Sequence, residues 1–262
     1  MPEAVNGAGR VIDLNSDLGE SFGPYQIGYD AELFPLISSA NVACGFHGGD
    51  PRVIERTIAA ATSQQVAVGA HPGYPDLVGF GRREIDATPD EIRTDTLYQI
   101  GAVDAFCRAA QLRLQHVKVH GALYHSIIKA DALAQAVVDA IVAYDRSLIV
   151  LAQPGTRFFA AAEAAGLKTA REGFADRAYN ADGTLVSRKI AGAMIDNPEV
   201  AAERALRLVT EGVIETIDGQ DLALSIDSLC IHSDTPGALE MATAIRHRFD
   251  EAGISVRPFG AA

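Results

Sequence analysis

The sequence predicts an α/β fold in which parallel strands alternate with helices and close into a barrel. Three observations favour it: seven short apolar stretches each run into Asp, Asn, His, Lys, Gln or Glu, helix-start signals lie between them, and no linker interrupts the 262 residues. A barrel of this kind takes about 250 residues, and its active site lies at the mouth formed by the C-terminal ends of the strands. The pattern therefore indicates an enzyme. The seven stretches are VIDLNSDLGE (11–20), NVACGFHGGD (41–50), VAVGAHPGYPD (66–76), VKVHGALYH (117–125), LIVLAQPG (148–155), LKTAREGFADR (167–177) and LCIHSDTP (229–236).

Helices are expected between these strands, because four sites pair a capping side chain with a proline at the first helical position. The pairs are Asp50-Pro51, Thr88-Pro89, Asn197-Pro198 and Thr235-Pro236, and Thr88 with Glu91 adds a capping box. We expect helices over residues 51–64, 89–113, 130–144, 156–165, 198–213 and 236–252. Strand and helix alternate, which predicts a parallel sheet and one domain over residues 1–262.

Composition excludes several classes of partner. A formal charge of −12 and a pI near 5.0 argue against nucleic acid and anionic membranes, which select clustered Lys and Arg. The segment MPEAVNGAGR lacks the apolar core of a signal peptide, and no apolar run approaches the roughly 18 residues of a membrane span. Cys44, Cys107 and Cys230 lie in apolar segments without CxxC spacing. We expect a soluble, cytoplasmic protein that acts on a small molecule.

Two stretches interrupt the alternation of strand and helix. Residues 72–88 are rich in Gly and Pro, and residues 174–192 contain Asp182-Gly183, which is a hairpin-turn signal. Long ordered loops at a barrel mouth are often lids or substrate walls. The alternative is a pair of mobile surface loops without a role.

Period-2 alternation predicts which side chains point into the barrel. In VIDLN, Asp13 and Asn15 share one face, and in HVKVH, Lys118 and His120 do. A lone buried charge costs several kcal/mol, so Asp13 and Lys118 should interact directly or through one shared group near the mouth. The pair would belong to the active site or be a purely structural ion pair.

Histidines lie at several strand ends. His232 opens HSDTP, so Asp234 could orient its imidazole for proton transfer or merely cap the next helix. His47, His71 and a carboxylate such as Asp17 could hold a divalent metal with an open coordination position, although neutral, hydrogen-bonded histidines explain the same pattern. Cys44 followed by His47 is read as packing before it is read as a nucleophile with its base.

Seven motifs, in order and spanning nearly the whole chain, carry a resemblance to a known family. They are DLNSDLGE, NVACGFHGGDP, GAHPGYPD, GFGRR, VKVHGALYH, REGFADRAY and HSDTPGA. Together they resemble the LamB/YcsF family, which provides the A subunit of the bacterial 5-oxoprolinase. The resemblance implies a distorted seven-stranded β/α barrel of the glycoside hydrolase/deacetylase superfamily and ATP-dependent opening of 5-oxo-L-proline to L-glutamate. It also implies two partner subunits, B and C, similar to allophanate hydrolase subunits.

The implied reaction assigns roles to particular side chains. A lactam is a poor electrophile, so phosphorylation of its oxygen would need cations, a group that activates water, and donors to the developing oxyanion. The cations would be Lys118, Arg82, Arg83 and Arg177, and the oxyanion donors Asn15 or the Gly48 and Gly49 amides. We expect catalytic roles for Asp13, Asp17, Lys118, His120, Glu172 and His232. We expect substrate-binding roles for Asn15, His47, Gly48, His71, Arg82, Tyr124, Arg177 and Asp234.

Nucleotide binding has no motif of its own, because the chain lacks GxxxxGK[ST], GxGxxG after a strand, and GxSxG. ATP, with Mg²⁺, would bind either at the barrel mouth or on the partner subunits. Two other functions stay open: a metal-dependent amide or carbohydrate deacetylase, and a non-catalytic component that binds the lactam. Superfamily deacetylases use an Asp/His/His metal site, but this chain lacks their closely spaced histidine pair.

Overall fold

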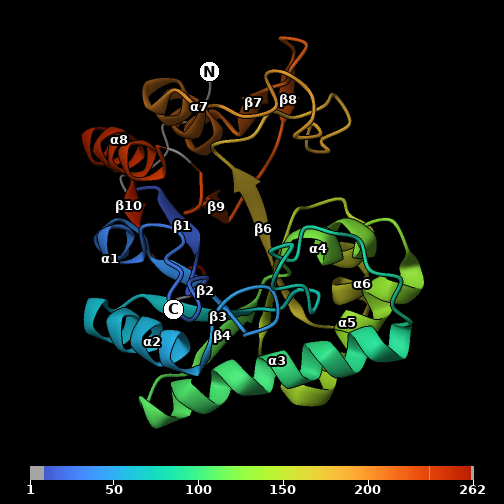
Figure 1. Ribbon diagram of the computed structural model, residues 1–262. Helices are drawn as coiled ribbons and strands as arrows, with labels where there is room; N and C mark the ends of the chain where they lie inside the picture. The colour runs from blue at the N-terminus through green and yellow to red at the C-terminus, as the bar shows by residue number, and fades with distance from the viewer. Residues whose placement is uncertain (1–8, 236, 261–262) are drawn as a thin grey trace.

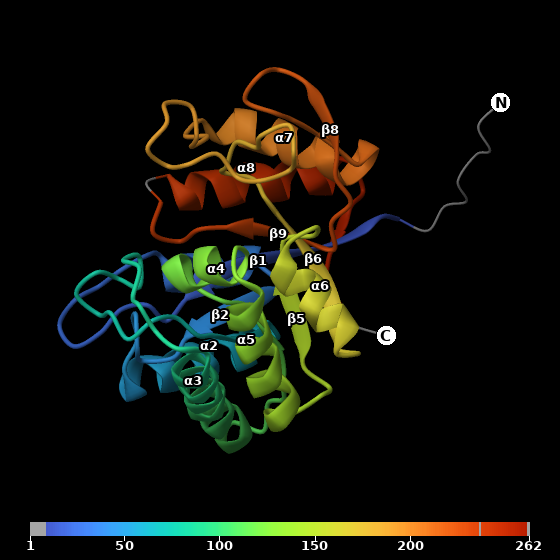
Figure 2. The ribbon, with the colours of Figure 1, turned by 90° about the vertical axis from the view of Figure 1, so that its right-hand side faces the viewer.

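A closed ring of parallel strands forms the centre of the molecule. The computed structural model describes residues 9–235 and 237–260 (Figures 1 and 2). The ring order is β1-β2-β3-β4-β5-β6-β9, and β9 pairs back onto β1, so the seven-stranded parallel barrel is confirmed. The strands are β1 (Val11–Leu18), β2 (Ser39–Ala43), β3 (Ala67–His71), β4 (Leu114–Val117), β5 (Ile149–Ala152), β6 (Lys168–Phe174) and β9 (Ser228–Ile231). A short strand, β10 (Ser255–Val256), pairs with the start of β1 outside the ring.

All six expected helices are present around the ring. They are α2 (Pro51–Gln64), α3 (Pro89–Ala109), α5 (Asp131–Tyr144), α6 (Arg157–Ala164), α7 (Pro198–Glu211) and α8 (Ala238–Glu251). The sequence reading missed α1 (Asp30–Leu33), η1 (Phe34–Leu36) and α4 (Gly121–Ile127), since such short helices show little of the 3.6-residue period. It also missed the antiparallel pair β7 (Val213–Glu215) and β8 (Asp221–Ala223), which lies beside α7 in Figure 1.

Three of the four predicted helix caps are confirmed. Asp50, Thr88 and Asn197 each accept a backbone N–H at the start of a helix whose first residue is proline, and Thr88 with Glu91 forms the capping box. The fourth prediction, a cap at Thr235, is wrong. The helix begins at Ala238 after Gly237, whose φ of 80° suits glycine, because Thr235 belongs to a turn that its N–H closes onto the His232 carbonyl. Pro236 lies outside the described residues.

The C-terminal segment closes the N-terminal end of the barrel. Phe259 packs edge-on against the His116 ring with centroids 5.0 Å apart, and the Gln115 side chain donates to the Phe259 carbonyl at 2.8 Å. His116 is fully buried and donates to Asn41 inside the ring. A Cβ on the neighbouring Gly69 would lie 2.2 Å from the His116 ring, so glycine at this position is what admits the imidazole. We call this end the barrel floor.

The two irregular stretches have defined structures. The segment that follows β3 passes over the mouth, where the Phe80 carbonyl lies 2.9 Å from Nε2 of His120. The predicted turn at Asp182-Gly183 is confirmed, since the Asn180 N–H donates to the Thr184 carbonyl at 2.8 Å and Gly183 has a φ of 83°. All three cysteines are buried and free. Within the described part of the chain, no helix has both the length and the apolar character needed to cross a membrane.

Candidate active site at the barrel mouth

Asp13 points into the barrel as predicted, but it lies at the floor and not at the mouth. It accepts hydrogen bonds from Ser38 and Ser39, both at 2.6 Å, and from Ser228. Five residues separate it from Leu18, where β1 ends, which is about 16 Å at the rise of a strand. The predicted link between Asp13 and Lys118 is wrong, because serine hydroxyls satisfy Asp13 and the two side chains share no hydrogen-bond partner. Its position gives Asp13 a structural role, and the catalytic role expected for it has no support here.

Lys118 is the centre of a buried ionic cluster. Its Nζ lies 2.7 Å from Oδ1 of Asp17 and 3.0 Å from Oε1 of Glu172, and it reaches the Cys230 sulfur at 3.1 Å. The lysine side chain is only 6% exposed. Because these three partners come from β1, β6 and β9, the ring closure itself assembles the cluster. We call Asp17, Lys118 and Glu172 the lysine cluster.

The lysine cluster shifts the pKa values of its members in opposite directions. Burial raises the pKa of Glu172, and Lys118 only partly opposes that effect. Burial would also raise the pKa of Asp17, but the charges of His71 and Lys118 hold it well below its usual value. Burial tends to lower the pKa of Lys118, yet Asp17, Cys230 and Glu172 raise it well above its usual value. The cluster thus holds one firmly ionised acid, one ammonium and one acid that is hard to ionise.

A carboxylate–imidazole pair adjoins the lysine cluster. Nδ1 of His232 lies 2.8 Å from Oδ2 of Asp176, and the His232 ring stacks on Phe174. Ligand atoms of Asp17, Cys230 and His232 lie within 4.8 Å of one another. Asp176, which sequence reasoning missed, takes the orienting role expected of Asp234, and Asp234 instead pairs with Arg82 at 2.6 Å. The only sequence signal for Asp176 was its place just after a strand in REGFADR.

Three histidines and one glutamate form a second buried group, which we call the imidazole cluster. It consists of Glu20, His47, His71 and His120, whose ligand atoms all lie within 4.8 Å of one another. The rings of His47 and His120 stack with centroids 3.7 Å apart. Burial lowers the pKa of His47 and of His120, so both imidazoles are neutral. The cluster could hold a metal ion.

The metal set expected from the sequence differs from this cluster. Asp17 lies 3.4 Å from Nε2 of His71, but its other oxygen is held by Lys118. Glu20 takes the place expected for Asp17, with Oε1 3.2 Å from Nε2 of His47. Sequence reasoning missed Glu20, although DLNSDLGE places it where the chain turns at Gly19 (φ 70°) just after β1. Gly48 packs against it, because a Cβ there would lie 2.9 Å from the Glu20 carbonyl oxygen.

The remaining predicted site residues lie around these groups. Asn15 bridges the floor and the mouth, since it donates to Ser228 and its oxygen accepts from Asn41. The Tyr124 hydroxyl accepts from the Gln153 N–H at 3.1 Å, and burial raises its pKa. Arg83 is bound to Asp76 beside the mouth. His120 belongs to the imidazole cluster, where contacts occupy both of its ring nitrogens.

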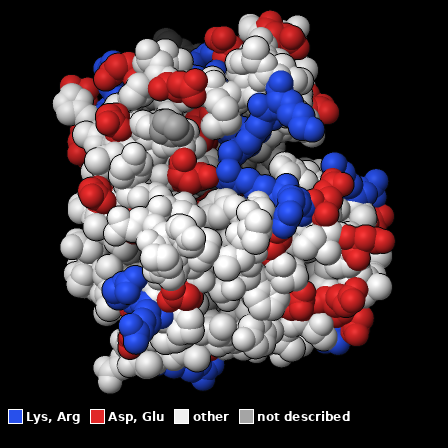
Figure 3. Space-filling view, in the orientation of Figure 1, with Lys and Arg blue, Asp and Glu red and all other residues white. Residues whose placement is uncertain are grey.

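Arg177 is a buried cation with no carboxylate within ion-pair distance among the residues described. It is 4% exposed, one guanidinium nitrogen donates to the Val186 carbonyl at 2.7 Å, and its Nε has no acceptor. Burial, and then the neighbouring Arg188, lower its pKa. Figure 3 shows Lys and Arg side chains gathered around a hollow in the face seen in Figure 1, although the chain as a whole is acidic. An uncompensated buried cation of this kind suits an anionic ligand.

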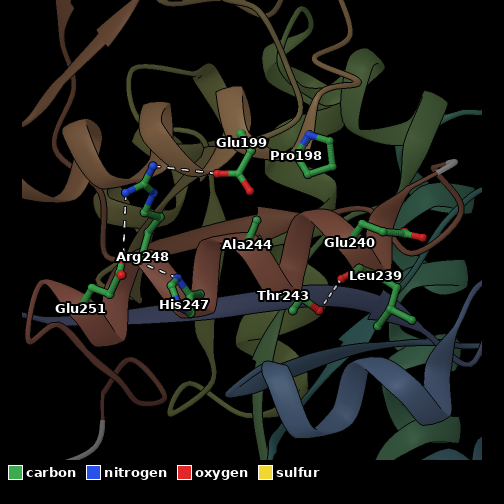
Figure 4. Close-up of a pocket in the computed structure, with 9 residues that line it drawn as sticks. All are labelled: Pro198, Glu199, Leu239, Glu240, Thr243, Ala244, His247, Arg248 and Glu251. Atoms are coloured by element: carbon green, nitrogen blue, oxygen red, sulfur yellow. Dashed lines mark hydrogen bonds and ion pairs between the residues drawn. The ribbon is translucent and has the colours of Figure 1, made fainter.

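A separate surface pocket lies between the start of α7 and α8 (Figure 4). Its charged residues pair among themselves: Arg248 lies 3.9 Å from Glu199 and 3.7 Å from Glu251, and His247 lies 3.5 Å from Glu251. The His247 side chain is 71% exposed. This pocket is outside the barrel and brings together no catalytic grouping.

Fold and mouth together define a class, a closed parallel β/α barrel that holds buried acid, base and imidazole groups where its strands end. Within this class the chain belongs to the LamB/YcsF family, whose model matches residues 12–262. It is 51% identical to the A subunit of 5-oxoprolinase from Pyrococcus furiosus over 95% of this chain and 98% of that one. It is also 51% identical to the protein of the same name from Symbiobacterium thermophilum, over 98% and 99%. The crystal structure of a lactam utilization protein from Thermus thermophilus superposes with a TM-score of 0.92 at 49% identity, over 95% and 99%.

Proposed function

We propose that this chain is the lactam-opening component of an ATP-dependent 5-oxoprolinase that cleaves 5-oxo-L-proline to L-glutamate together with partner subunits. One observation carries the proposal: the lysine cluster and the Asp176–His232 pair meet at one barrel mouth. Relatives at 51% identity over nearly the whole chain are named as the A subunit of 5-oxoprolinase, and the similar solved structure is that of a lactam utilization protein. Amide opening needs an acid, a base and positive charge, which these groups offer.

In the proposed reaction His232 activates water. Asp176 accepts the N–H of Nδ1, which leaves a lone pair on Nε2 to take the proton of the attacking water. The His232 side chain is 14% exposed, so it can reach a molecule in the mouth. Asp176 is a positioning residue, since it acts through the imidazole.

Lys118 and Glu172 serve the oxygen and the nitrogen of the amide. Lys118 stabilises the oxygen as it gains negative charge, and Asp17 holds the ammonium in place at 2.7 Å. Glu172 donates a proton to the leaving ring nitrogen, because its raised pKa keeps it protonated more readily than an ordinary glutamate. Once the C–N bond breaks, the nitrogen becomes the amine of glutamate.

Arg177 would receive the phosphate that activates the lactam. Lys118, Arg82 and Arg83 all pair with carboxylates, whereas Arg177 has none in the described part of the chain. A guanidinium binds phosphate oxygens with two parallel hydrogen bonds. The nucleotide itself would come from the partner subunits, since the chain carries no nucleotide motif.

The test is glutamate release from 5-oxoproline with ATP and Mg²⁺, measured for the purified chain alone and with subunits B and C added. We expect little or no turnover by the chain alone and turnover with both partners. ATP-dependent turnover by the single chain would refute the assignment of ATP to the partners. Absence of turnover in the full mixture, with a known 5-oxoprolinase active in parallel, would refute the function.

A second function is favoured by the imidazole cluster. Three imidazoles and a carboxylate are the donors of many metal-dependent amide hydrolases. Such an enzyme would hydrolyse acetamides or lactams with a metal ion alone, so turnover without ATP would select it over the first proposal.

A further inference from the structure

Hydrogen-bond accounting in the imidazole cluster leaves two nitrogen lone pairs in conflict. Nδ1 of His71 lies 2.8 Å from the Lys118 carbonyl oxygen, and Nε2 of His120 lies 2.9 Å from that of Phe80. A carbonyl oxygen can only accept, so each of these nitrogens carries its ring proton. In the neutral rings the lone pairs then lie on Nε2 of His71 and Nδ1 of His120, and these atoms are 3.0 Å apart. Buried lone pairs at this distance require a cation, which is either an extra proton or a metal ion.

The spacing of the four donor atoms matches a shared ion. Oε1 of Glu20 lies 3.2 Å from Nε2 of His47 and 3.5 Å from Nδ1 of His120. Two ligands at a Zn–N length of about 2.0–2.1 Å and angles between about 90° and 110° lie about 3.0–3.4 Å apart. A carbonyl that accepts the second N–H of a ring is also the usual way in which a metal-binding histidine is oriented. His71 and His120 both have such a partner.

We propose that Glu20, His47, His71 and His120 bind one divalent transition-metal ion of the zinc type. Three imidazoles and one carboxylate select such ions over Mg²⁺ and Ca²⁺, which prefer all-oxygen sites. The burial of all four residues argues for a bound ion held tightly within the protein. This set excludes Asp17 as a ligand, because Lys118 holds one of its oxygens, yet Oδ2 of Asp17 faces the cluster at 3.4 Å from His71.

The site joins the chemistry of the mouth through that contact. When bound, the ion would supply a fixed positive charge able to polarise a carbonyl or phosphoryl oxygen. Asp17 touches Lys118 on one side and His71 on the other, so it couples the two clusters. The metal proposal does not depend on lactam opening, and its test measures binding alone.

The experiment measures metal content and affinity of the full chain, purified without a histidine tag. After removal of metal with a chelator, the chain is titrated with Zn²⁺, Co²⁺ and Mg²⁺ separately, with calorimetry for all three and the visible absorption of Co²⁺ as a direct probe of nitrogen ligands. We expect one equivalent of Zn²⁺ or Co²⁺ per chain and none of Mg²⁺. Glu20→Gln and His120→Asn should each weaken Co²⁺ binding at least about tenfold. His247→Ala, on the exposed face of α8, should bind as the parent does.

Two results would overturn the proposal. One is a folded parent chain, as judged by circular dichroism, that takes up neither Zn²⁺ nor Co²⁺. The other is equal Co²⁺ affinity in the parent and in Glu20→Gln, which keeps the shape of the side chain if His120→Asn fails to fold. An imidazolium signal from His71 in ¹⁵N NMR that persists in excess Zn²⁺ would assign the cation to a proton and would also overturn it.

Discussion

Replacing Lys118 with methionine removes the only cation that holds two buried carboxylates. The ammonium lies 2.7 Å from Asp17 and 3.0 Å from Glu172, and all three side chains are at most 7% exposed. Methionine fills similar volume, so the change isolates the charge. Breaking a buried pair by removal of one partner typically costs about 3–5 kcal/mol, because the other charge stays buried without compensation. Against a typical total of about 5–15 kcal/mol, that is a large share of the free energy of unfolding.

The measurement is guanidinium chloride unfolding at pH 7 followed by circular dichroism. The matched control is Arg157→Met, because Arg157 lies 2.6 Å from Asp131 but both side chains are more than half exposed. Such a surface pair contributes at most about 1 kcal/mol. If Lys118→Met costs no more than Arg157→Met, burial does not make this cluster important and the reasoning fails. At pH 5 the loss should shrink, since the freed carboxylates can then take up protons.

Three further predictions test the floor and the mouth. Asp13→Asn should flatten the pH dependence of stability: burial raises the pKa of Asp13 to about 6, so the folded parent binds this proton more tightly than the unfolded chain. The parent should thus lose about 3 kcal/mol of unfolding free energy relative to the variant between about pH 4 and pH 6, and parallel curves would contradict this. Gly69→Ala should destabilise by about 1–3 kcal/mol or more because its Cβ would overlap His116, whereas Gly101→Ala, with nothing closer than 3.8 Å, should be neutral or stabilising; chemical denaturation of both variants gives the comparison. Glu172→Ala or His120→Ala should abolish coupled glutamate release and leave the circular dichroism spectrum largely unchanged, while His247→Ala should retain the activity; equal damage from all three would contradict the mouth as the site.

Strand parity carried most of what the sequence could predict. It placed Asp13, Lys118, Cys230 and His232 inside the ring, and the strand ends brought His47, His71 and His120 into one group. Parity fixes the face of a strand but not the height along it, which is why Asp13 was expected near the mouth although it lies at the floor.

Partners set by loops were beyond the reach of the pattern. Glu20 and Asp176 both follow strands, but their contacts with His47 and His232 depend on turns whose path no periodicity describes. Asp234 and Asp176 were equally plausible partners for His232 from the sequence, and only the fold shows that Arg82 takes Asp234. The short helix α4 was missed for the same reason, since seven residues contain too few turns to reveal a face.

Closure of the ring by β9 has a consequence for the order in which the protein acquires its chemistry during synthesis. Every ligand of the imidazole cluster lies between residues 20 and 120, whereas Cys230 and His232 arrive after the long excursion between β6 and β9. Until residues 228–231 have emerged, β1 and β6 face each other across a gap, each with an unpaired edge that another nascent chain can occupy. The base that activates water thus arrives with the strand that seals the barrel, and a chain still open to aggregation is also a chain that cannot yet act.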